Sequence, residues 1–340
     1  MQHQPSQQAA GAATRRAVLK LTAAAGALAL TGTRALAQAQ GAIAPGGKPI
    51  RMIVAVGAGG ATDVLARTVG ERMAQAMAQP VVVENMPAAS GAIAAQTVAR
   101  AAPDGTTLLI GTNTTHASNQ VFIKQLSYDP IGDFEPVALL GRTTLVLCVD
   151  PKLPVKNVQE LIAHAKANPG KLEFASGTGS ARMAGEMFKD HAKIDILSVP
   201  YRSNAQGLVD LIGGRIAMIF GDMSLMLPHI KAGSVRALAV AGAQRSPLAP
   251  DLPTVRESGL PNYQLTGFIA AFAPARTPAA VVSRLNLEMN RVLADGTIAN
   301  SLLANGIEPA RGTPQELQAF VAVEAQRWAD IGRAAGIQAE

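Results

Sequence analysis

A glycine-rich corner at Gly57–Asp63 places the strongest constraint on how this chain can fold. It follows the apolar, β-rich run Ile50–Val56 and precedes residues 64–77, whose apolar positions repeat with the period of a helix. A strand that feeds a helix through glycines directs several backbone N–H groups and the positive end of the helix dipole toward one point. The corner therefore predicts an anion site, which would suit either a dinucleotide pyrophosphate or a carboxylate.

A second strand–glycine–helix corner lies at Ser176–Ser180. A β-like run at 172–175 precedes it and a helical pattern at 181–191 follows it. Glycines let the backbone turn tightly and approach a ligand closely. The hydroxyl groups of this segment either donate to a carboxylate oxygen or cap the helix. Two such corners suggest two similar lobes that present helix N-termini toward a shared cleft.

Short β-like runs alternate with helical patterns along the chain, which is typical of βαβ units around mostly parallel sheets. We therefore predict an α/β fold. The predicted strands are 50–56, 80–84, 106–110, 134–140, 145–149, 172–175, 196–200, 216–220 and 236–240. The predicted helices are 62–78, 91–101, 158–168, 181–191, 204–213, 278–295 and 314–335.

The first 37 residues have the pattern of a twin-arginine signal peptide. Arg15 and Arg16 precede a weakly hydrophobic segment at 21–30, and the A-x-A pattern Ala35–Ala37 marks a cleavage site. The apolar part is too short and too rich in alanine and glycine for a membrane span. We therefore predict export to the periplasm and a mature chain that begins at Gln38; removing 37 of the 340 residues leaves 303.

The leader carries four of the six net positive charges, so the mature protein has a net charge near +2. A net charge this small gives no indication of a basic surface that binds nucleic acid or a membrane. The single cysteine, Cys148, lies in an apolar run, and we expect it to be buried rather than nucleophilic. No G-x-S-x-G elbow, H-E-x-x-H motif or Cys/His cluster supports hydrolase chemistry or a metal site.

Polar side chains follow several predicted strands, and ligands of open α/β sheets bind beyond the carboxyl ends of strands. Arg202 either pairs with an acidic ligand or lies solvated at the surface. Asp63 and Asp222 are both candidates to bind an ammonium group of the ligand. For Asp63 the alternative is to stabilise a helix N-terminus. Tyr201 either stacks on a ligand or lines the core, and His116 is the histidine that we place near the cleft. The predicted ligand-binding residues are Gly59, Gly60, Ala61, Thr62, Asp63, Thr112, Thr114, Thr115, Ser176, Gly177, Thr178, Gly179, Ser180, Tyr201, Arg202, Ser203 and Asp222.

Short motifs also occur in a defined order along the mature sequence. They are Lys48–Arg51, Gly59–Asp63, Val81–Asn85, Ala101–Gly105, Tyr128–Pro130, Ala167–Lys171, Leu227–Gly233 and Pro250–Thr254. With these motifs, the chain resembles the substrate-binding receptors of tripartite tricarboxylate transporters, often called the Bug family. The resemblance covers essentially all of the mature sequence.

This resemblance implies a two-lobed fold like that of type II periplasmic binding proteins, with mixed sheets, helices on both faces and a hinge of crossing strands. It places lobe 1 at 48–142 and 270–340 and lobe 2 at 143–269, with crossings near 145–149 and 265–272. It also implies a monomer that binds a small carboxylate without catalysis, cofactor, metal or nucleic acid. Membrane permease subunits are the implied partners, for uptake, with sensing as the other possible role. Citrate-like acids, dicarboxylates, acidic amino acids and aromatic carboxylates all stay open as ligands.

Three departures from the family pattern bear on the ligand. Gly57 and Ala58 stand where the family usually has two prolines, which predicts a more flexible first loop. Arg202–Ser203 replaces a Lys-Gly pair, and Arg182 replaces a histidine-like or small polar residue. Extra guanidinium groups would favour a second carboxylate through bidentate pairing.

The alternative function is that of an exported NAD(P)-dependent oxidoreductase that uses the loop at 57–63. Twin-arginine export carries folded, often cofactor-loaded proteins, and Gly57–Gly59 opens like a dinucleotide fingerprint. The sixth position of that fingerprint, however, is Thr62 rather than Gly or Ala. Glu84 lies slightly late in the sequence for an acid that binds ribose.

Overall fold

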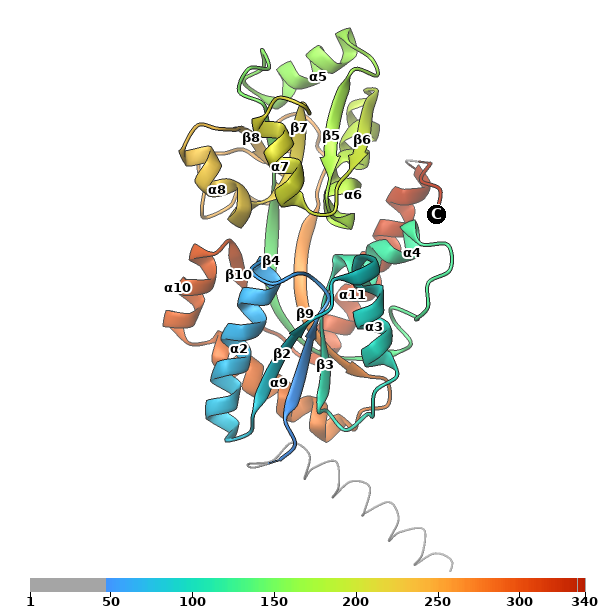
Figure 1. Cartoon of the computed structure of the whole chain (residues 1–340), viewed down its shortest axis with the longest axis vertical. Coiled ribbons are helices and arrows are strands. Elements are labelled where there is room, and N and C mark those ends of the chain that lie inside the picture. The colour runs from blue at the N-terminus through green and yellow to red at the C-terminus, as the bar shows by residue number, and fades with distance from the viewer. Residues whose placement is uncertain (1–46, 335, 340) are drawn as a thin grey trace, which may run out of the picture.

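The computed structural model describes residues 47–334 and 336–339, and the predicted twin-arginine leader lies outside them. Figure 1 shows two lobes along the long axis of the molecule, with two long strands running from one lobe to the other. We call the lower lobe in this view lobe 1 and the upper, green-to-yellow one lobe 2. Both lobes combine a sheet with covering helices, which confirms the predicted two-lobed α/β fold.

The sheet of lobe 1 has the strand order β2-β1-β3-β9-β4, with β10 beside β4. Its strands are β1 (Ile50–Val54), β2 (Val81–Asn85), β3 (Thr107–Thr112), β4 (Phe134–Val149), β9 (Thr266–Pro274) and β10 (Ile307–Pro309). Its helices are α2 (Ala61–Met77), η1 (Ala88–Gly91), α3 (Ala92–Ala99), η2 (Thr114–Ser118), α4 (Asn119–Phe122), α9 (Ala279–Leu293), α10 (Gly296–Ala304) and α11 (Pro314–Ala334). The strands β1, β2 and β3 are parallel, whereas β9 is antiparallel to both β3 and β4.

Strand β1 shows why helices cover both faces of this sheet. Met52 and Val54 are fully buried and belong to a core that includes residues of α2 and α9. Ile53, which points to the other face, belongs to a core that includes residues of α3 and α11. A strand that is apolar on both faces can be stable only when both faces are covered. The continuous apolar run in the sequence therefore predicted this layer correctly.

The sheet of lobe 2 has the order β4-β7-β5-β6, and β8 pairs with β4. Its other strands are β5 (Leu172–Ser176), β6 (Ile196–Pro200), β7 (Met218–Asp222) and β8 (Arg236–Val240). Its helices are α5 (Val158–Ala167), α6 (Gly179–Ala192), α7 (Asn204–Ile212) and α8 (Met223–Lys231). Cys148 is fully buried in β4, as expected, and burial raises the pKa of its thiol.

Strand β4 joins the two lobes and is one strand of 16 residues, where the sequence predicted two shorter ones. Its first part pairs with β9 as far as Thr144, and its last part, from Leu145, pairs with β7 and β8. The register against β9 shifts near Pro136 and between Leu139 and Gly141. These irregularities occur at a proline and at a glycine. The lobe boundaries proposed at 142/143 and 269/270 stay a prediction.

Several helices were not predicted from the sequence. η2, a single π-helical turn, and α4 replace the loop expected after β3, and α8 and α10 are additional. Pro228 lies inside α8, and an interior proline normally argues against a helix because it removes an N–H donor. The residues at 111–116 are mostly polar, so the sequence favoured a loop there. Their burial depends on contacts from distant parts of the chain, which the local pattern does not show.

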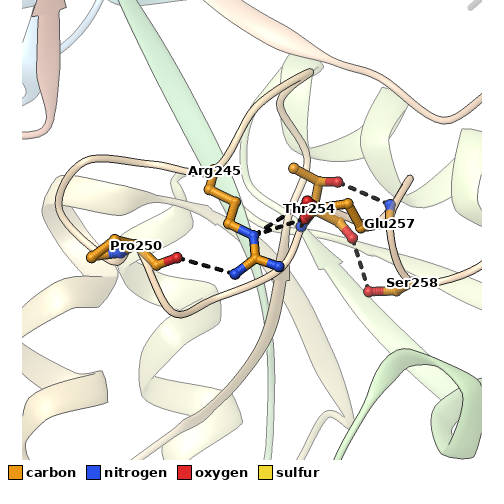
Figure 2. A network of polar contacts seen from close by, with 5 residues as sticks. All are labelled: Arg245, Pro250, Thr254, Glu257 and Ser258. Atoms are coloured by element: carbon orange, nitrogen blue, oxygen red, sulfur yellow. Dashed lines mark hydrogen bonds and ion pairs between the residues drawn. The ribbon is translucent and has the colours of Figure 1, made fainter.

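A polar network fixes the proline-rich segment that leads from β8 toward β9 (Figure 2). Thr254 and Glu257 cap each other: Glu257 N donates to Thr254 Oγ1 at 2.9 Å, and Thr254 N donates to Glu257 Oε2 at 2.8 Å. Arg245 donates to the same carboxylate and to the carbonyl of Pro250. Because these contacts join both ends of the segment, it follows one defined path over lobe 2.

Asn113 strengthens lobe 1 where β9 leaves it for lobe 2. Its side chain is 1% exposed, and its Nδ2 donates to the carbonyl of Thr266 at 3.1 Å. Its Oδ1 accepts a 2.6 Å hydrogen bond from the backbone N–H of Phe268. One side-chain amide thus continues the β3–β9 ladder after the backbone of β3 has ended.

We expect Asn113→Ala to lower the free energy of unfolding by about 1–3 kcal/mol, because it leaves a buried donor and a buried acceptor without partners. Urea denaturation of the mature protein measures this loss. Asn305→Ala, which removes an exposed amide, is the matched control and should change stability by less than about 0.5 kcal/mol. Equal effects of the two substitutions would contradict the role given to Asn113.

Candidate functional site

A cavity between the two lobes lies beyond the carboxyl ends of β5 and β6 and has a volume of about 350 Å³. Lobe 1 provides Ser90, Asn119, Phe122 and Ile123. Lobe 2 provides Ser176, Gly177, Thr178, Gly179, Arg182, Ser198, Pro200 and Tyr201. We call this space the interlobe cavity.

A larger groove of about 590 Å³ lies along α6 and α11. Its wall includes Met187, His191, Val323 and Ile331, and none of its lining residues was predicted to bind a ligand. Helix sides border it, whereas ligands of α/β proteins bind at the ends of strands. The smaller interlobe cavity is therefore the better candidate site.

The second glycine corner forms part of the wall of the interlobe cavity and is held rigidly. A Cβ atom added to Gly177 would lie 2.2 Å from the backbone nitrogen of Asn204, so only glycine fits there. The hydroxyl of Ser176 donates to the carbonyl of Val199 at 3.1 Å, and the hydroxyl of Ser198 donates to Ser176 Oγ at 3.1 Å. These bonds fix the strand end next to the cavity.

The N-terminus of α6 opens at this corner. Thr178 is its N-cap, and Thr178 Oγ1 accepts a 3.1 Å hydrogen bond from Ala181 N. The hydroxyl of Thr178 therefore caps the helix, which was the alternative to direct ligand binding. The N–H groups of Gly179 and Ser180 occupy the first two helical positions, where the helix itself offers no acceptor. The first turn of α6 contains no acidic residue, so the positive end of the helix dipole is not offset there.

The first glycine corner does not contribute to the wall of the interlobe cavity. Residues 57–60 are exposed at the end of lobe 1 that faces lobe 2 (Figure 1). Gly59 has a φ of 84°, a conformation that favours glycine. Gly60 is the N-cap of α2, and Ala61 and Thr62 begin the helix without a side-chain cap. The structure thus brings the first corner toward lobe 2 but not into the cavity.

Asp63 holds the first corner in shape. It is 3% exposed, and its carboxylate accepts hydrogen bonds from Gly59 N at 2.9 Å, from Arg67 Nε at 3.1 Å and from Asn85 Nδ2 at 2.9 Å. Burial raises the pKa of this carboxyl, but the hydrogen bonds outweigh burial, so the pKa lies below its ordinary value. These contacts agree with the alternative in which Asp63 stabilises the start of α2.

The polar residues after β3 fold into the turn of η2 rather than into a loop. Thr115 is fully buried, and its Oγ1 accepts a hydrogen bond from Thr112 N at 3.0 Å. Thr114 lies near the cavity wall, because its Cγ2 would be 3.6 Å from a Cβ added to Gly179. Thr112 Oγ1 accepts a hydrogen bond from Thr114 N, so its hydroxyl shapes the turn.

His116 does not lie near the cleft, and that expectation was wrong. Its ring is fully buried and stacks on Phe272 with 3.7 Å between the ring centroids. Burial lowers the pKa of His116 to about 3, so the imidazole is neutral. Phe134 also packs against the ring, and the Nε2 atom of His116 is buried without a hydrogen-bond partner among the described residues.

Tyr201 lines the interlobe cavity, but its hydroxyl is bound within lobe 2. The hydroxyl donates to Asp210 Oδ2 at 2.7 Å, and Asp210 in turn accepts a hydrogen bond from Arg215. Burial and the adjacent carboxylate raise the pKa of Tyr201 to about 12. The tyrosine thus presents its ring to the cavity. Arg202, the next residue, is exposed and is not among the cavity-lining residues.

Ser203 and Asp222 act behind the cavity wall. Ser203 is the N-cap of α7, and its side chain accepts a hydrogen bond from Gln206 N. Asp222 accepts a 3.1 Å hydrogen bond from Asn204 Nδ2, and burial raises the pKa of the Asp222 carboxyl. Asn204 Oδ1 is buried without a hydrogen-bond partner in the described part of the chain. Neither Ser203 nor Asp222 lines the cavity.

None of the four lobe 1 residues of the cavity wall, Ser90, Asn119, Phe122 and Ile123, was predicted from the sequence. Ser90 has a φ of 53°, and Ala89 before it has a φ of 50°, so both adopt a left-handed conformation that non-glycine residues rarely take. Asn119 fixes this turn, because its Nδ2 donates to the Ser90 carbonyl at 3.2 Å and to Tyr128 Oη at 3.0 Å. The run of small residues at 88–91 was the available signal.

Arg182 and Phe122 meet across the cavity from opposite lobes. The guanidinium carbon of Arg182, on α6, lies 4.6 Å from the ring centroid of Phe122, on α4. This is a cation–π contact. Phe122 was not predicted, because nothing in the sequence places a residue of lobe 1 opposite α6.

The sequence of this chain is similar to proteins of a described family. A sequence profile described as the tripartite tricarboxylate transporter family receptor matches residues 65–337. The chain belongs to this receptor family. Protein BugT of Bordetella pertussis is 35% identical over 292 residues, which cover 85% of this chain and 90% of that protein.

Solved receptor structures agree with the fold. Rpa4515 of R. palustris, solved with adipate, has a TM-score of 0.81 and 34% identity and covers 86% of this chain and 99% of its own. MatC of Rhodopseudomonas palustris, solved with bound malate, has a TM-score of 0.76 and 32% identity and covers 84% of this chain and 99% of its own. The receptor is therefore a periplasmic solute-binding protein of the Bug type.

The oxidoreductase alternative receives no support from this family membership or from the expected ribose-binding acid. Both oxygens of Glu84 are bound by Arg51, at 2.8 Å each. In residues 47–334 and 336–339, no group of three or more His, Cys, Asp or Glu side chains is placed to hold a metal ion. No helix in the same residues is long and apolar enough to cross a membrane.

We expect Asp63→Asn to destabilise the receptor by about 1–2 kcal/mol at pH 7, because hydrogen bonds to a charged carboxylate are lost. The pKa of Asp63 is depressed in the folded state, so its stabilisation is present above the unfolded pKa of about 3.9 and declines as the pH falls through the folded value. The difference between the two proteins should therefore narrow at acid pH, as measured by urea denaturation at pH 7 and near pH 3. Asp251→Asn, at an exposed position, is the charge-matched control. A pH-independent difference would contradict this role.

Proposed function

We propose that this receptor captures a small organic carboxylate in the interlobe cavity. The observation that carries the proposal is the N-terminus of α6, which opens into a cavity whose opposite wall belongs to the other lobe. Family membership supports it, because related receptors were solved with adipate and with malate. The cavity volume of about 350 Å³ is at the small end of ligand pockets, which suits a metabolite of a few carbon atoms.

The chemistry of binding is electrostatic and geometric. A carboxylate at the start of α6 would accept hydrogen bonds from the N–H groups of Gly179 and Ser180. Hydrogen bonds to a charged group contribute about 1.5–3 kcal/mol each, and the helix dipole adds about 0.3–1 kcal/mol. The rigid approach of Gly177 to α7 keeps these donors in place before the ligand arrives, which limits the entropy lost on binding.

Contacts between the lobes supply the means of closure. A Cβ added to Gly179 would lie 2.4 Å from Ser118 Oγ of lobe 1. A Cβ added to Gly306 of lobe 1 would lie 2.8 Å from the backbone nitrogen of Ser224 in lobe 2. The lobes are therefore in close contact at two glycines. A ligand that touches both lobes would stabilise this closed form over an open one.

The captured carboxylate would then be presented to membrane permease subunits for uptake, or to a sensory partner. Family membership supports the transport role, since the family consists of receptors of a transporter. We propose that the receptor acts as a monomer, and that the twin-arginine leader directs its export.

Carboxylates should raise the melting temperature of the mature protein. A ligand at 100 times its dissociation constant contributes about 2.7 kcal/mol, which corresponds to a rise of about 4 °C for a protein of this size. Thermal-shift measurements with adipate, malate, citrate, aspartate and benzoate test this, with the neutral adipamide and NAD as controls. A rise with NAD alone, or no rise with any carboxylate, would contradict the proposal.

Closure itself can be tested at the contact between Gly179 and Ser118. We expect Gly179→Ala to weaken carboxylate binding by about 1–2 kcal/mol, because the added methyl group meets Ser118 Oγ only when the lobes close. Adding Ser118→Ala to the same chain removes the obstructing oxygen and should restore most of the affinity. Isothermal titration calorimetry measures both proteins. If adding Ser118→Ala does not restore the carboxylate affinity, binding does not depend on the approach of Gly179 to Ser118, and the proposed closure is contradicted.

A further inference from the structure

Helix α11 contributes to the apolar cores of both lobes. Leu317 and Val321, in its first half, are buried in a core of lobe 1 that also contains Phe268. Trp328, further along the same helix, is 1% exposed and belongs to the core of lobe 2 together with Phe188. In Figure 1, α11 is drawn in red, leaves lobe 1 beside α4 and rises to the height of α6. One helix therefore reaches from one lobe into the other.

The whole of α11 is fixed to lobe 1. Between its first residue, a proline, and Gly332 the helix contains no further proline or glycine, so it has none of the usual sites for a kink. Gln120 of α4 donates from Nε2 to the carbonyl of Ala325 at 2.8 Å. A Cβ added to Gly332 would lie 2.4 Å from Cγ1 of Val121, so α11 packs tightly on α4. The half of α11 that carries Trp328 is thus held on lobe 1, although its indole belongs to the core of lobe 2.

The contact of Trp328 with lobe 2 is apolar and needs no hydrogen bond from that lobe. The indole Nε1 donates to Glu324 Oε2, one turn earlier in α11, at 3.4 Å. Helices α11 and α6 are in contact, but a groove of about 590 Å³ separates Met187 of α6 from Ile331 of α11, so the two helices do not pack along their whole length. Separating the lobes would therefore break no hydrogen bond of the indole, but it would expose apolar surface to water.

The same interface carries the contacts that close the interlobe cavity. Ala117 of η2 is 1% exposed and, like Trp328, belongs to the core of lobe 2. Its neighbour Ser118 lies at the close approach to Gly179. Trp328 itself does not line the interlobe cavity. The burial of this indole and the closure of the cavity thus depend on the same approach of the two lobes.

We propose that Trp328 is a conformational latch. Its indole is inserted into the core of lobe 2 when the receptor is closed, is withdrawn with lobe 1 when the receptor opens, and stabilises the closed form before any ligand binds. A receptor that is closed more often binds its ligand more tightly, because the apparent dissociation constant is the intrinsic one divided by the closed fraction. Trp328 thus raises the affinity for a ligand that it does not touch.

Two variants hold the lobes closed or apart without a ligand. A Cβ added to Gly179 would lie 3.3 Å from the Cβ of Ser118, close to the separation of about 3.5–4.5 Å that a disulfide spans. Ser118→Cys with Gly179→Cys should therefore lock the receptor closed when it is oxidised. Gly179→Leu places a larger side chain at the same contact and should keep the lobes apart. Small-angle X-ray scattering checks that the second protein is the more extended.

Trp328 is the single tryptophan of the chain, so tryptophan fluorescence reports on it alone. We expect its emission to lie at longer wavelength, and acrylamide to quench it more strongly, in Gly179→Leu than in the oxidised double-cysteine protein. Phe320→Trp in a Trp328→Phe background is the control, because Phe320 packs against Phe268 within lobe 1. The emission of the control should be the same in both forms. Equal burial of Trp328 in the extended and the locked proteins would overturn the proposal, because α11 would then stay with lobe 2.

The engineered disulfide also measures how much Trp328 stabilises closure. Glutathione disulfide oxidises the two thiols and is reduced to two molecules of glutathione, and the equilibrium constant of this exchange rises with the closed fraction. Adding Trp328→Leu should lower the constant about 10-fold, because less apolar surface is buried on closure. Adding Phe320→Leu, on the same helix in lobe 1, should change it by less than about 3-fold. Equal changes would show a general loss of packing and would overturn the role given to Trp328. The fluorescence comparison keeps Trp328 in place, so it holds even where Trp328→Leu lowers the yield of folded protein.

Discussion

The structure depends on strand β4, which belongs to the sheets of both lobes. Strand β4 begins in the sheet of lobe 1 and ends in the sheet of lobe 2, and β9 pairs with it up to the crossing. Each lobe needs part of β4 to complete its sheet, so this strand joins the two lobes. Asn113 extends the β3–β9 ladder close to this point. The interlobe cavity, the contacts at Gly179 and Gly306, and the stack of Arg182 on Phe122 all lie between the two lobes.

The positively charged parts of the cavity wall come from lobe 2, whereas lobe 1 supplies polar and apolar side chains. The start of α6 and Arg182 belong to lobe 2, whereas Ser90, Asn119 and Phe122 belong to lobe 1. A ligand that first binds the backbone N–H groups at the start of α6 would therefore gain its contacts with lobe 1 when the lobes close. The two lobes would not bind the ligand in equivalent ways. This asymmetry differs from the sequence-based expectation of two equivalent glycine corners, because the first corner, organised by Asp63, lies outside the cavity wall.

The sequence predicted the layers of the fold and one half of the candidate site. Apolar periodicity located β1 and its covering helices, and the glycines located the corner at Ser176–Ser180, because both signals are local. The sequence could not place Phe122 opposite Arg182, since that contact joins two lobes. It misplaced His116, whose burial depends on Phe272 far along the chain. Each hydroxyl in the second corner also had two possible partners, and only packing decided between capping and ligand binding.

The central claim is that a carboxylate bridges the two lobes at the start of α6. A crystal structure of the mature receptor grown with the diacid that raises its melting temperature most would test this directly. We expect one carboxylate within hydrogen-bond distance of the N–H groups of Gly179 and Ser180, with the rest of the ligand in contact with Ser90, Asn119 or Phe122 of lobe 1. A ligand bound outside the interlobe cavity, or in contact with one lobe only, would contradict the account.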